Sequence, residues 1–370
     1  MAMKKILLGY SGGLDTSMAI PWLADKYGAE IVTLTVDLGQ GRELDESRGR
    51  AVAIGAARAH VIDVQNEFAR DFVLPALQAG AMYEGRYPLA TALGRPLIAK
   101  YLVEVARIEG ADAIAHGGTN EDNDLVRLGA CIRALDANIE MIPLTTVWSF
   151  TRAQKIAYAR AHGIPTPTEA DARYTIDANL WGRSIAFGGL EDAWQEPPED
   201  IYSITRAPAD APATAAYVEI EFDRGVPVRI NGVEMSLVEL ITSLETIAGS
   251  HGIGRIDIVE NRVVGTKSRE VYEAPAAVAL HAAHRDLQTF VLPRDLERIA
   301  SDLSVKYADA VYHGLWYAPM REAIQALVSQ VQLRVTGAIR LKLFKGDCRV
   351  VGRQSPFAHD SAAPIAAKAD

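Results

Sequence analysis

The strongest constraint on the fold is the regular alternation of predicted strands and helices through the first 165 residues. Runs of aliphatic and β-branched residues predict buried strands at 4–10, 30–38, 60–64, 112–117 and 138–144. The segments between them have helical patterns at 14–28, 43–59, 65–82 and 95–109. Because strands that alternate with helices align in parallel, this order predicts a parallel sheet with helices on both faces.

Two glycine-rich turns, at 11–13 and 117–118, directly follow predicted strands. Ligands of open parallel sheets bind at the carboxyl ends of the strands. We therefore expect both turns at the ligand-binding edge of the sheet.

The pattern changes after residue 165. Residues 165–182 are typical of a loop, and 197–214 form a connector rich in proline, alanine and aspartate. Beyond it we predict hairpins at 217–232 and 338–352, a strand pair within 255–265, and helices at 238–250, 275–291, 293–313 and 317–331. The predicted fold class is therefore α/β, with a parallel-sheet domain over 1–165, an α+β domain over 166–356, and a flexible tail over 357–370.

Composition argues against several classes of protein. The net charge of −9 disfavours a nucleic-acid surface spread over the molecule, because phosphate contacts need clustered lysine and arginine. The two cysteines, Cys131 and Cys348, are far apart and lack partners at metal-ligand spacing, as in a reducing cytoplasm. The start of the chain lacks the apolar run of a signal peptide, and no stretch approaches the roughly 18 apolar residues of a membrane span. We expect a cytoplasmic protein that binds neither nucleic acid nor membrane.

The segment GYSGGLDTS at 9–17 is the strongest single motif. We expect Gly12 and Gly13 to adopt positive φ and to let the backbone approach a ligand. Consecutive N–H groups before a helix N-terminus form an anion cradle, and the hydroxyls of this segment add donors. Asp15 suits indirect binding of Mg²⁺ or a helix cap. The motif is neither GxxxxGK(S/T) nor GxGxxG, so it predicts a nucleotide-phosphate loop of a different kind.

This loop resembles the SGGxDS/T loop of the N-type ATP pyrophosphatases. Members of that superfamily cleave ATP between the α and β phosphates and attach AMP to a carbonyl or ureido oxygen, from which an amine or thiol displaces it. Two isolated cysteines are poor candidates for the reactive thiols of a tRNA thiolase, and no glutaminase module is visible.

Longer segments resemble the argininosuccinate synthase family. They are YEGRYPLATALGRPLIAK at 83–100, IDANLWGRS at 176–184, HGIGRIDIVENRVVGTKSREVYEAP at 251–275, YHGLWYAP at 312–319, and the C-terminal GAIRLKLFKG and VGRQSP. The resemblance runs co-linearly from the first strand to about residue 356. It implies an adenine nucleotide α-hydrolase-like domain followed by a synthetase domain. It also implies an AMP-forming ligase of arginine biosynthesis that joins citrulline to aspartate.

The resemblance assigns residues to three ligands. ATP, with its Mg²⁺, would be held by Tyr10, Ser11, Gly12, Gly13, Asp15, Thr16, Ser17, Val36 and Gly117. Citrulline would be surrounded by Tyr87, Thr91, Asn123, Arg127, Thr175, Ser184, Glu260 and Tyr272. Aspartate would be held by Thr119, Asn123 and Asp124. The catalytic set implied is Asp15, Ser17, Asp124 and Arg127, with no metal bound directly by the protein.

The residue types suit these roles. A guanidinium presents a fork to a carboxylate, so Arg127 is the expected clamp for the citrulline carboxylate. Glu260 suits the α-ammonium, and Asp124 the ammonium of aspartate. His116 reads as a structural residue at the end of a strand rather than as a base, because the incoming amine can lose its proton to phosphate or water.

The chain departs from the family at three places. The family pattern HGxTGKGNDQ is HGGTNEDNDL here, so Asn120, Glu121 and Asp122 replace a glycine, a lysine and a glycine. The family's SIEGG is SIAFGG here, where a site acid becomes Ala186 and Phe187 fills a glycine position, so we expect a less charged and bulkier citrulline wall. Relatives continue beyond VGRQSP into a segment exchanged between subunits; we expect a homo-oligomer, with the family tetramer or a smaller assembly both open.

Three functions stay open at this point. The first is citrulline–aspartate ligation despite the altered loop. The second is a ligase with the same adenylation chemistry but another amine or ureido substrate, which the acidic segment at 120–122 would favour. The third is a nucleotide-binding paralogue without catalysis.

Overall fold

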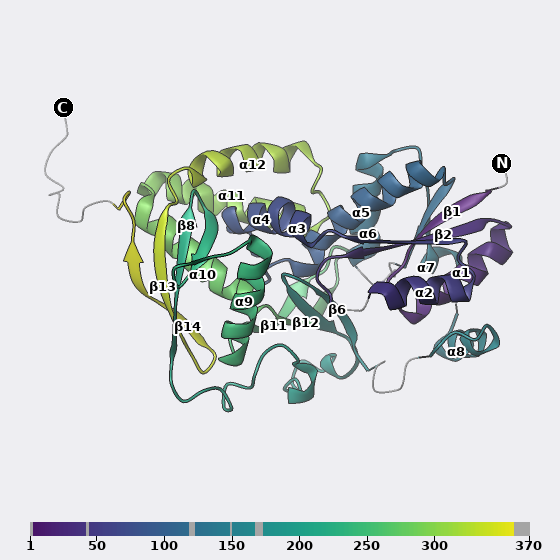
Figure 1. Ribbon diagram of the computed structural model, residues 1–370, viewed down its shortest axis with the longest axis horizontal. Helices are drawn as coiled ribbons and strands as arrows, with labels where there is room; N and C mark the ends of the chain where they lie inside the picture. Colours follow the sequence, from purple (N-terminus) through teal and green to yellow (C-terminus); the bar gives the residue numbers. More distant parts are fainter. Residues whose placement is uncertain (1–2, 42–43, 118–122, 149, 167–172, 359–370) are drawn as a thin grey trace, which may run out of the picture.

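Five parallel strands form the sheet of the first half of the chain. In the computed structural model, which describes residues 3–41, 44–117, 123–148, 150–166 and 173–358, they are β1 (Lys5–Gly9), β2 (Glu30–Asp37), β3 (Arg58–Asp63), β4 (Ala113–His116) and β5 (Glu140–Pro143). Their spatial order is β3-β2-β1-β4-β5, and every pair is parallel. Figure 1 shows the neighbouring strands β1 and β2 of this sheet. The predicted parallel sheet is confirmed.

The side chains of β1 point alternately into two hydrophobic cores, one on each face of the sheet. Ile6 and Leu8 pack with the cluster that contains α1 (Leu14–Tyr27) and α2 (Leu44–Ile54). Leu7, between them, packs into the cluster that contains α5 (Ala90–Glu109) and α6 (Asn123–Leu135). Successive strand residues face opposite sides, so helices cover both faces, as predicted.

Several helix boundaries differ from the predictions. The helix predicted over 43–59 ends at Ile54, because Gly55 has a φ of 119° and β3 begins three residues later. The segment predicted as one helix over 65–82 consists of α3 (Gln65–Glu67), a π-helical stretch η1 (Phe68–Val73) and α4 (Leu74–Gln78). The next helix, α5, begins at Ala90 rather than at 95.

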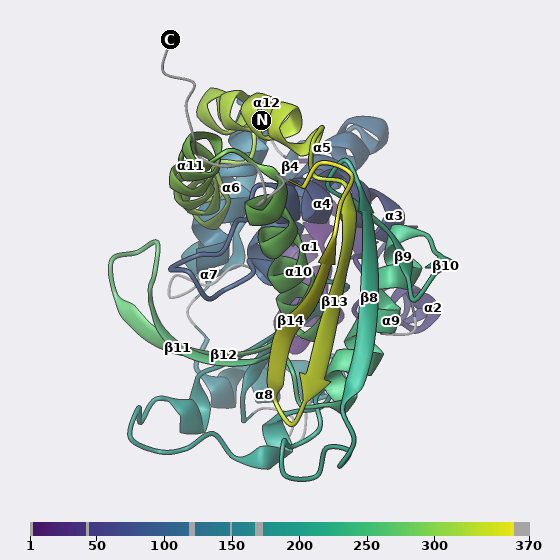
Figure 2. The same cartoon turned by 90° about the vertical axis from the view of Figure 1, so that its left-hand side faces the viewer.

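Two antiparallel sheets follow in the second half. One has the order β10-β9-β8-β13-β14 and consists of β8 (Ala216–Asp223), β9 (Val226–Ile230), β10 (Val233–Glu234), β13 (Gly337–Phe344) and β14 (Asp347–Gln354). It contains both predicted hairpins. The other has the order β11-β12-β7-β6, with β6 (Thr175–Asn179), β7 (Gly182–Ala186), β11 (Arg255–Asn261) and β12 (Lys267–Glu273). Figure 2 shows β11 and β12 as a long curved hairpin that projects from the body.

The β11-β12-β7-β6 sheet corrects two predictions. Residues 165–182 are not all loop, since β6 lies within them and pairs with β7. The segment 255–265 holds one strand and a turn rather than a strand pair, and the partner strand is β12. Both errors concern short, polar strands whose pairing depends on neighbours elsewhere in the chain.

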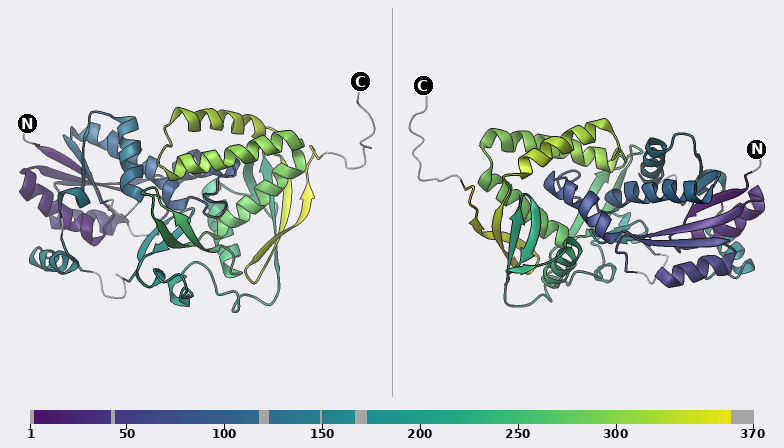
Figure 3. Two further views of the ribbon diagram at one scale, coloured as in Figure 1. Left: turned by 180° about the vertical axis from the view of Figure 1, so that it is seen from behind. Right: turned by 45° about the horizontal axis from the view of Figure 1, so that its top comes forward.

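The predicted helices of the second half are confirmed. They are α9 (Leu237–Ser250), α10 (Pro275–Val291), α11 (Arg294–Tyr312) and α12 (Pro319–Gln332). The shorter elements are α7 (Leu144–Val147), α8 (Arg152–Ala161), and the 3₁₀ turns η2 (Gly188–Leu190) and η3 (Glu199–Ile201). Helix α8 packs beside α1 (Figure 3, left view). None of the helices within the described residues is both long and apolar enough to cross a membrane.

The largest core is continuous across both halves of the chain. It runs from Leu7 of β1 through Trp181 to Leu343 of β13. Helix α5 contributes to it and also contacts β6 and β7. The β11-β12-β7-β6 sheet is therefore anchored beside the parallel sheet, and this contact is what places side chains from the two halves around one cavity.

Candidate active site

A cavity of about 1060 Å³ lies where the carboxyl ends of β1, β2 and β4 meet the β11-β12-β7-β6 sheet. The two glycine-rich turns contribute to its wall through Gly13 and Gly117, as the position of turns at strand ends predicted. Tyr272 and Ser184 line it from the second half of the chain. One cavity thus receives the residues assigned to nucleotide and to amino acid.

The loop after β1 is shaped by hydroxyl contacts. Ser11 Oγ lies 3.0 Å from Thr16 Oγ1, and the Gly13 N–H donates to Ser11 Oγ at 3.3 Å. Tyr10 Oη lies 3.0 Å from Ser17 Oγ. These contacts orient the loop before any ligand arrives.

Only one of the two loop glycines has the predicted positive φ. Gly12 has a φ of 75°, whereas Gly13 has a φ of −76° and is the N-cap of α1. The Gly13 carbonyl accepts from the N–H of Ser17 at 3.0 Å, so α1 begins with its N-terminal N–H groups toward the loop. Asp15 makes no capping hydrogen bond.

Asp15 instead pairs with a lysine that is not among the predicted site residues. Lys155 Nζ, on α8, lies 2.8 Å from Asp15 Oδ1 and 2.9 Å from Oδ2. Arg152, on the same helix, lines the cavity too, and Arg50 Nη1 donates to the Gly12 carbonyl at 3.0 Å. No sequence signal marked these cations, because they lie far from the loop along the chain.

The opposite end of the cavity holds tyrosines and hydroxyls. The Tyr87 ring stacks on Tyr272 with centroids 4.1 Å apart, and Tyr87 Oη accepts the N–H of Thr91 at 3.0 Å. Thr91 Oγ1 lies 3.2 Å from Ser184 Oγ. Thr175 also lines the cavity, from β6.

Glu260 is buried on β11 and is bound by two phenols. Tyr272 donates to Glu260 Oε2 at 2.7 Å, and Tyr312 donates to Oε1 at 2.5 Å. Burial raises the pKa of Glu260, while the two tyrosine hydrogen bonds and the charge of Arg127 act against that rise. Tyr312 was absent from the predicted site, and its distance along the chain explains why.

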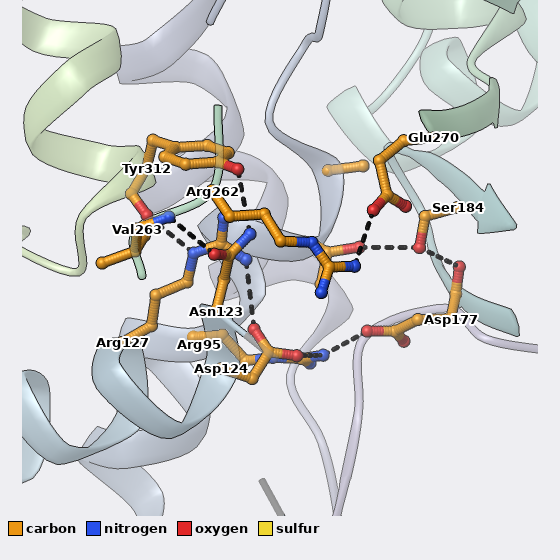
Figure 4. Close-up of polar contacts among 12 residues, drawn as sticks. Arg95, Asn123, Asp124, Arg127, Asp177, Ser184, Arg262, Val263, Glu270 and Tyr312 are labelled. Atoms are coloured by element: carbon orange, nitrogen blue, oxygen red, sulfur yellow. Dashed lines mark hydrogen bonds and ion pairs between the residues drawn. The ribbon is translucent and has the colours of Figure 1, made fainter. Parts of the chain in front are cut away.

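Asp124 lies between two arginines (Figure 4). Arg95 Nη2 lies 2.6 Å from Asp124 Oδ2, and Arg127 Nη1 lies 3.2 Å from Oδ1. Arg95 also pairs with Asp177. Burial raises the pKa of the Asp124 carboxyl, but the two guanidiniums outweigh burial and hold it below its usual value.

The wall near Ala186 carries charges from β12 and from the turn that precedes it. Glu270 lies directly opposite Ala186 in the β12–β7 register, and both line the cavity. Arg262 Nη2 donates to Glu270 Oε1 at 3.0 Å, and its guanidinium lies over the Phe187 ring at 4.8 Å. The neighbouring strand thus supplies a carboxylate to this wall, and the lower charge expected relative to the family stays a prediction. The added bulk of Phe187 is present.

The structure collects nearly all the described candidate residues in this cavity. Those lining it are Tyr10, Ser11, Gly13, Asp15, Thr16, Val36, Tyr87, Thr91, Gly117, Asn123, Asp124, Arg127, Thr175, Ser184, Glu260 and Tyr272. Gly12 and Ser17 do not line the cavity, but both make contacts that hold the loop: the Gly12 carbonyl accepts from Arg50, and Ser17 Oγ contacts Tyr10 Oη. Thr119 and the substituted Asn120, Glu121 and Asp122 lie outside the described residues.

Three further groups could titrate: His116 and Cys131 are buried, and Cys348 is half-buried. Burial lowers the pKa of His116, which lines the cavity, to about 4, so its imidazole is neutral at pH 7. Burial raises the pKa of the Cys131 thiol to about 12 and that of Cys348 to about 11. Thiolates are therefore scarce at these two positions.

Comparison with known proteins agrees with this geometry. A family model described as the arginosuccinate synthase N-terminal HUP domain matches residues 5–165, and one described as the arginosuccinate synthase C-terminal domain matches 174–363. Argininosuccinate synthase of Dictyoglomus thermophilum is 52% identical over 357 residues, covering 96% of this chain and 89% of that protein. That of Oceanobacillus iheyensis is 49% identical over 355 residues, covering 96% and 85%.

The comparison with solved structures gives less information than the family models and relatives do. A U34-tRNA thiolase from Methanococcus maripaludis is 14% identical, covers 45% of this chain and 58% of its own, and superposes with a TM-score of 0.31. That score is too low to support an argument. The two family models and the relatives near 50% identity carry the assignment: the chain belongs to the argininosuccinate synthase family.

Proposed function

We propose that this protein ligates citrulline to aspartate at the expense of ATP, forming argininosuccinate, AMP and pyrophosphate. The observation that carries the proposal is the single cavity in which the SGGLDTS loop faces Arg127 and Glu260. The family membership of the chain supports the same reaction.

Two displacements make up the reaction. The ureido oxygen of citrulline attacks the α-phosphorus, the bond to the bridging oxygen breaks, and pyrophosphate leaves. The aspartate amine then attacks the ureido carbon, and the bond from that carbon to the AMP oxygen breaks. The amine proton passes to phosphate or water, since neither step requires a strong base. Holding all three reactants in one cavity supplies much of the rate.

The end of the cavity at the loop after β1, here called the nucleotide end, would bind phosphate through backbone N–H groups and cationic side chains. The N–H groups at the start of α1 and the hydroxyls of Ser11 and Thr16 present donors to an anion. Because the loop has no lysine, positive charge comes from Lys155 and Arg152 on α8. These two side chains are placed to neutralise charge that develops on the leaving pyrophosphate.

Magnesium fits this end as part of the nucleotide complex. Mg²⁺ prefers phosphate oxygens and water as ligands, and the Asp15 carboxylate at the loop would hold such a hydrated ion indirectly, through its water. No cluster of three or more His, Cys, Asp or Glu ligands occurs among the described residues. Bound Mg²⁺ would supply charge neutralisation for the phosphates, while Lys155 holds the Asp15 side chain at the mouth of the loop.

The amino-acid end offers complementary charges. Arg127, 4% exposed, faces the cavity with its guanidinium, and Glu260 is 2% exposed on the facing hairpin. A carboxylate near Arg127 and an ammonium near Glu260 would each meet a desolvated partner of opposite sign. The hydroxyls of Thr91 and Ser184 suit a neutral ureido group.

The charge balance of the described cavity wall suits anionic substrates. Its cations are Arg95, Arg127, Arg152, Lys155, Arg183 and Arg262. Its carboxylates are Asp15, Asp124, Asp177, Glu260 and Glu270. Among the described residues, the one additional cation suits the phosphates of ATP and the carboxylates of aspartate.

We further propose a homo-oligomer, a cytoplasmic location, and two domains over 1–165 and 166–356 with a tail over 357–370. The continuity of the largest core across residue 165 implies that the two domains unfold together. Light scattering of the purified chain measures the oligomer.

A pyrophosphate-release assay tests the reaction. ATP, Mg²⁺, citrulline and aspartate together should release pyrophosphate and give argininosuccinate by mass, and omission of any one should abolish the product. Release with another amine in place of aspartate would replace this proposal by the divergent ligase. Binding of ATP in a calorimeter without pyrophosphate from any mixture of amines would identify a non-catalytic paralogue instead.

A further inference from the structure

Tyr312 does not line the cavity itself. It contacts three residues at the end assigned to the amino-acid substrate: Asn123, Arg127 and Glu260. Its hydroxyl donates to Glu260 Oε1 at 2.5 Å and accepts from Asn123 Nδ2 at 2.9 Å. Its backbone carbonyl accepts from Arg127 Nε at 2.7 Å. As the last residue of α11, it lies beside Asn123 and Arg127 of α6 (Figure 4). Through Glu260 it also joins that helix to β11.

The ring of Tyr312 is as constrained as its hydroxyl. It is fully buried and stacks on Tyr83 with centroids 3.5 Å apart and an interplanar angle of 4°. The Arg127 guanidinium also lies over this ring, 4.5 Å from its centroid. A ring held by both contacts cannot change rotamer without disturbing Arg127.

The hydroxyl of Tyr312 has used its donor and one acceptor position, so it fixes the roles of its neighbours. Asn123 must donate its Nδ2–H to Tyr312, which leaves its Oδ1 to accept the Val263 N–H at 2.8 Å. The Arg127 Nε is committed to the Tyr312 carbonyl, so the remaining guanidinium nitrogens point to Asp124 and the cavity. One residue therefore orients an amide and a carboxylate through its hydroxyl and a guanidinium through its backbone carbonyl.

The charge of Glu260 depends on the same contact. Burial favours its neutral form, and the hydrogen bonds from Tyr312 and Tyr272 and the charge of Arg127 favour the ionised form. Glu84, from the loop before α5, and Glu270, on β12, are the nearby acids that act with burial. Loss of the Tyr312 hydroxyl therefore removes one of the hydrogen bonds that stabilise the ionised form of Glu260.

We propose that Tyr312 is a positioning residue, which holds Arg127 and Glu260 in register to bind the carboxylate and ammonium of a free α-amino acid. This inference rests on the proposed function only for the identity of that amino acid, citrulline. Its role is in substrate binding rather than in nucleotide binding, because it contacts none of the loop residues at 9–17.

The test compares two hydroxyl deletions on the same helix. Tyr312→Phe removes the bonds to Glu260 and Asn123 and keeps the ring stack and the backbone carbonyl. Tyr307→Phe is the matched control, since Tyr307 is equally buried on α11 and its hydroxyl donates to Gln325 Oε1 at 2.8 Å, outside the cavity. Isothermal titration measures citrulline and ATP binding to wild type and both variants between pH 5 and 8.

Tyr312→Phe should raise the Kd for citrulline at least about tenfold and leave the Kd for ATP unchanged, since a hydrogen bond to a charged group is lost. The pH below which citrulline binding weakens should rise by about one unit, because Glu260 is then ionised less readily. Tyr307→Phe should bind both ligands as wild type does. A purely structural role for Tyr312 would lower stability without moving the pH profile, and that result overturns the inference.

A second variant changes the Tyr312 hydroxyl without removing it, so that the test does not depend on whether Tyr312→Phe folds. 3-Fluorotyrosine at position 312 keeps the ring and both hydrogen bonds while making the hydroxyl a stronger donor, so the pH limit should move down instead of up. An unchanged limit in this variant also overturns the inference.

The outcomes separate this inference from the proposed function. Wild type that binds citrulline but releases no pyrophosphate with aspartate contradicts the proposed reaction, and the Tyr312 comparison still decides the inference. Equal citrulline binding by wild type and Tyr312→Phe contradicts the inference alone. Wild type that binds no citrulline contradicts both.

Discussion

Lys155 Nζ lies 2.8 Å from Asp15 Oδ1. Helix α8 therefore places a cation at the phosphate loop that follows β1. Both side chains line the cavity, and both are partly exposed there. The pair therefore holds a carboxylate and an ammonium at the mouth of the loop, each within reach of an incoming Mg²⁺–ATP complex.

Lys155→Met should raise the KM for ATP about tenfold or more, since one charge-assisted hydrogen bond to phosphate is lost. The KM for citrulline should not change, and Lys155→Arg should restore much of the ATP affinity because the charge returns. Lys100→Met is the control: Lys100 makes a similar ion pair, 2.7 Å to Glu67, away from the cavity. Steady-state kinetics with ATP varied measures both; equal KM values for Lys155→Met and Lys100→Met would refute a phosphate role.

Asp124→Asn should destabilise the fold by about 3–5 kcal/mol, because Arg95 and Arg127 lose a buried countercharge. Asp71→Asn, which removes an exposed partner of Arg70, should cost no more than about 1 kcal/mol. Urea unfolding at pH 7 gives both free energies. Similar values for the two variants would show that the Asp124 cluster gains little from its charges.

His284 should make the folded state less stable in mild acid. Burial lowers its pKa to about 4, whereas an unfolded histidine titrates near 6.5. Between these values the unfolded chain binds the extra proton, so this contribution to stability is intact above pH 6.5 and is lost as pH falls toward 4. At pH 5 the loss from this residue is about 2 kcal/mol.

His284→Gln, compared with wild type by urea unfolding at pH 7.5 and pH 5, should remove that loss. The variant will be the less stable protein at pH 7.5, because the 2.8 Å bond from His284 Nε2 to Gln332 Oε1 is disturbed, and the gap should narrow at pH 5. A gap that stays constant with pH would mean that His284 does not titrate as described.

The two thiols should react slowly. Because burial raises their pKa values to about 12 at Cys131 and about 11 at Cys348, iodoacetamide at pH 8 should leave both unmodified in the native protein and label both in urea. Mass spectrometry of the labelled peptides checks this. Rapid native labelling with loss of pyrophosphate release would reopen a role for a thiol in the chemistry.

Local sequence patterns were enough for the parallel sheet and its ligand-binding edge. A strand such as β2 is nearly continuous in β-branched and aliphatic residues, and α1 ends at Gly28 in the left-handed conformation that a C-terminal glycine favours. The SGGLDTS segment carries its own hydroxyls and helix start, so its shape depends mainly on residues within nine positions. The short, polar strand β6 lacks such a signal, so its sequence predicts a loop.

The tertiary structure decided how the site is charged. Tyr312 meets Glu260 and Asn123 across 52 and 189 positions, and Lys155 meets Asp15 across 140, so no local pattern records either contact. Glu270 supplies a carboxylate opposite Ala186 only because β12 pairs with β7 in that register. The sequence by itself determined which chemistry the chain carries, since phosphate loops and helix periodicity are local. Only long-range packing determined which charges face one another, because those pairings depend on the contact between the two halves.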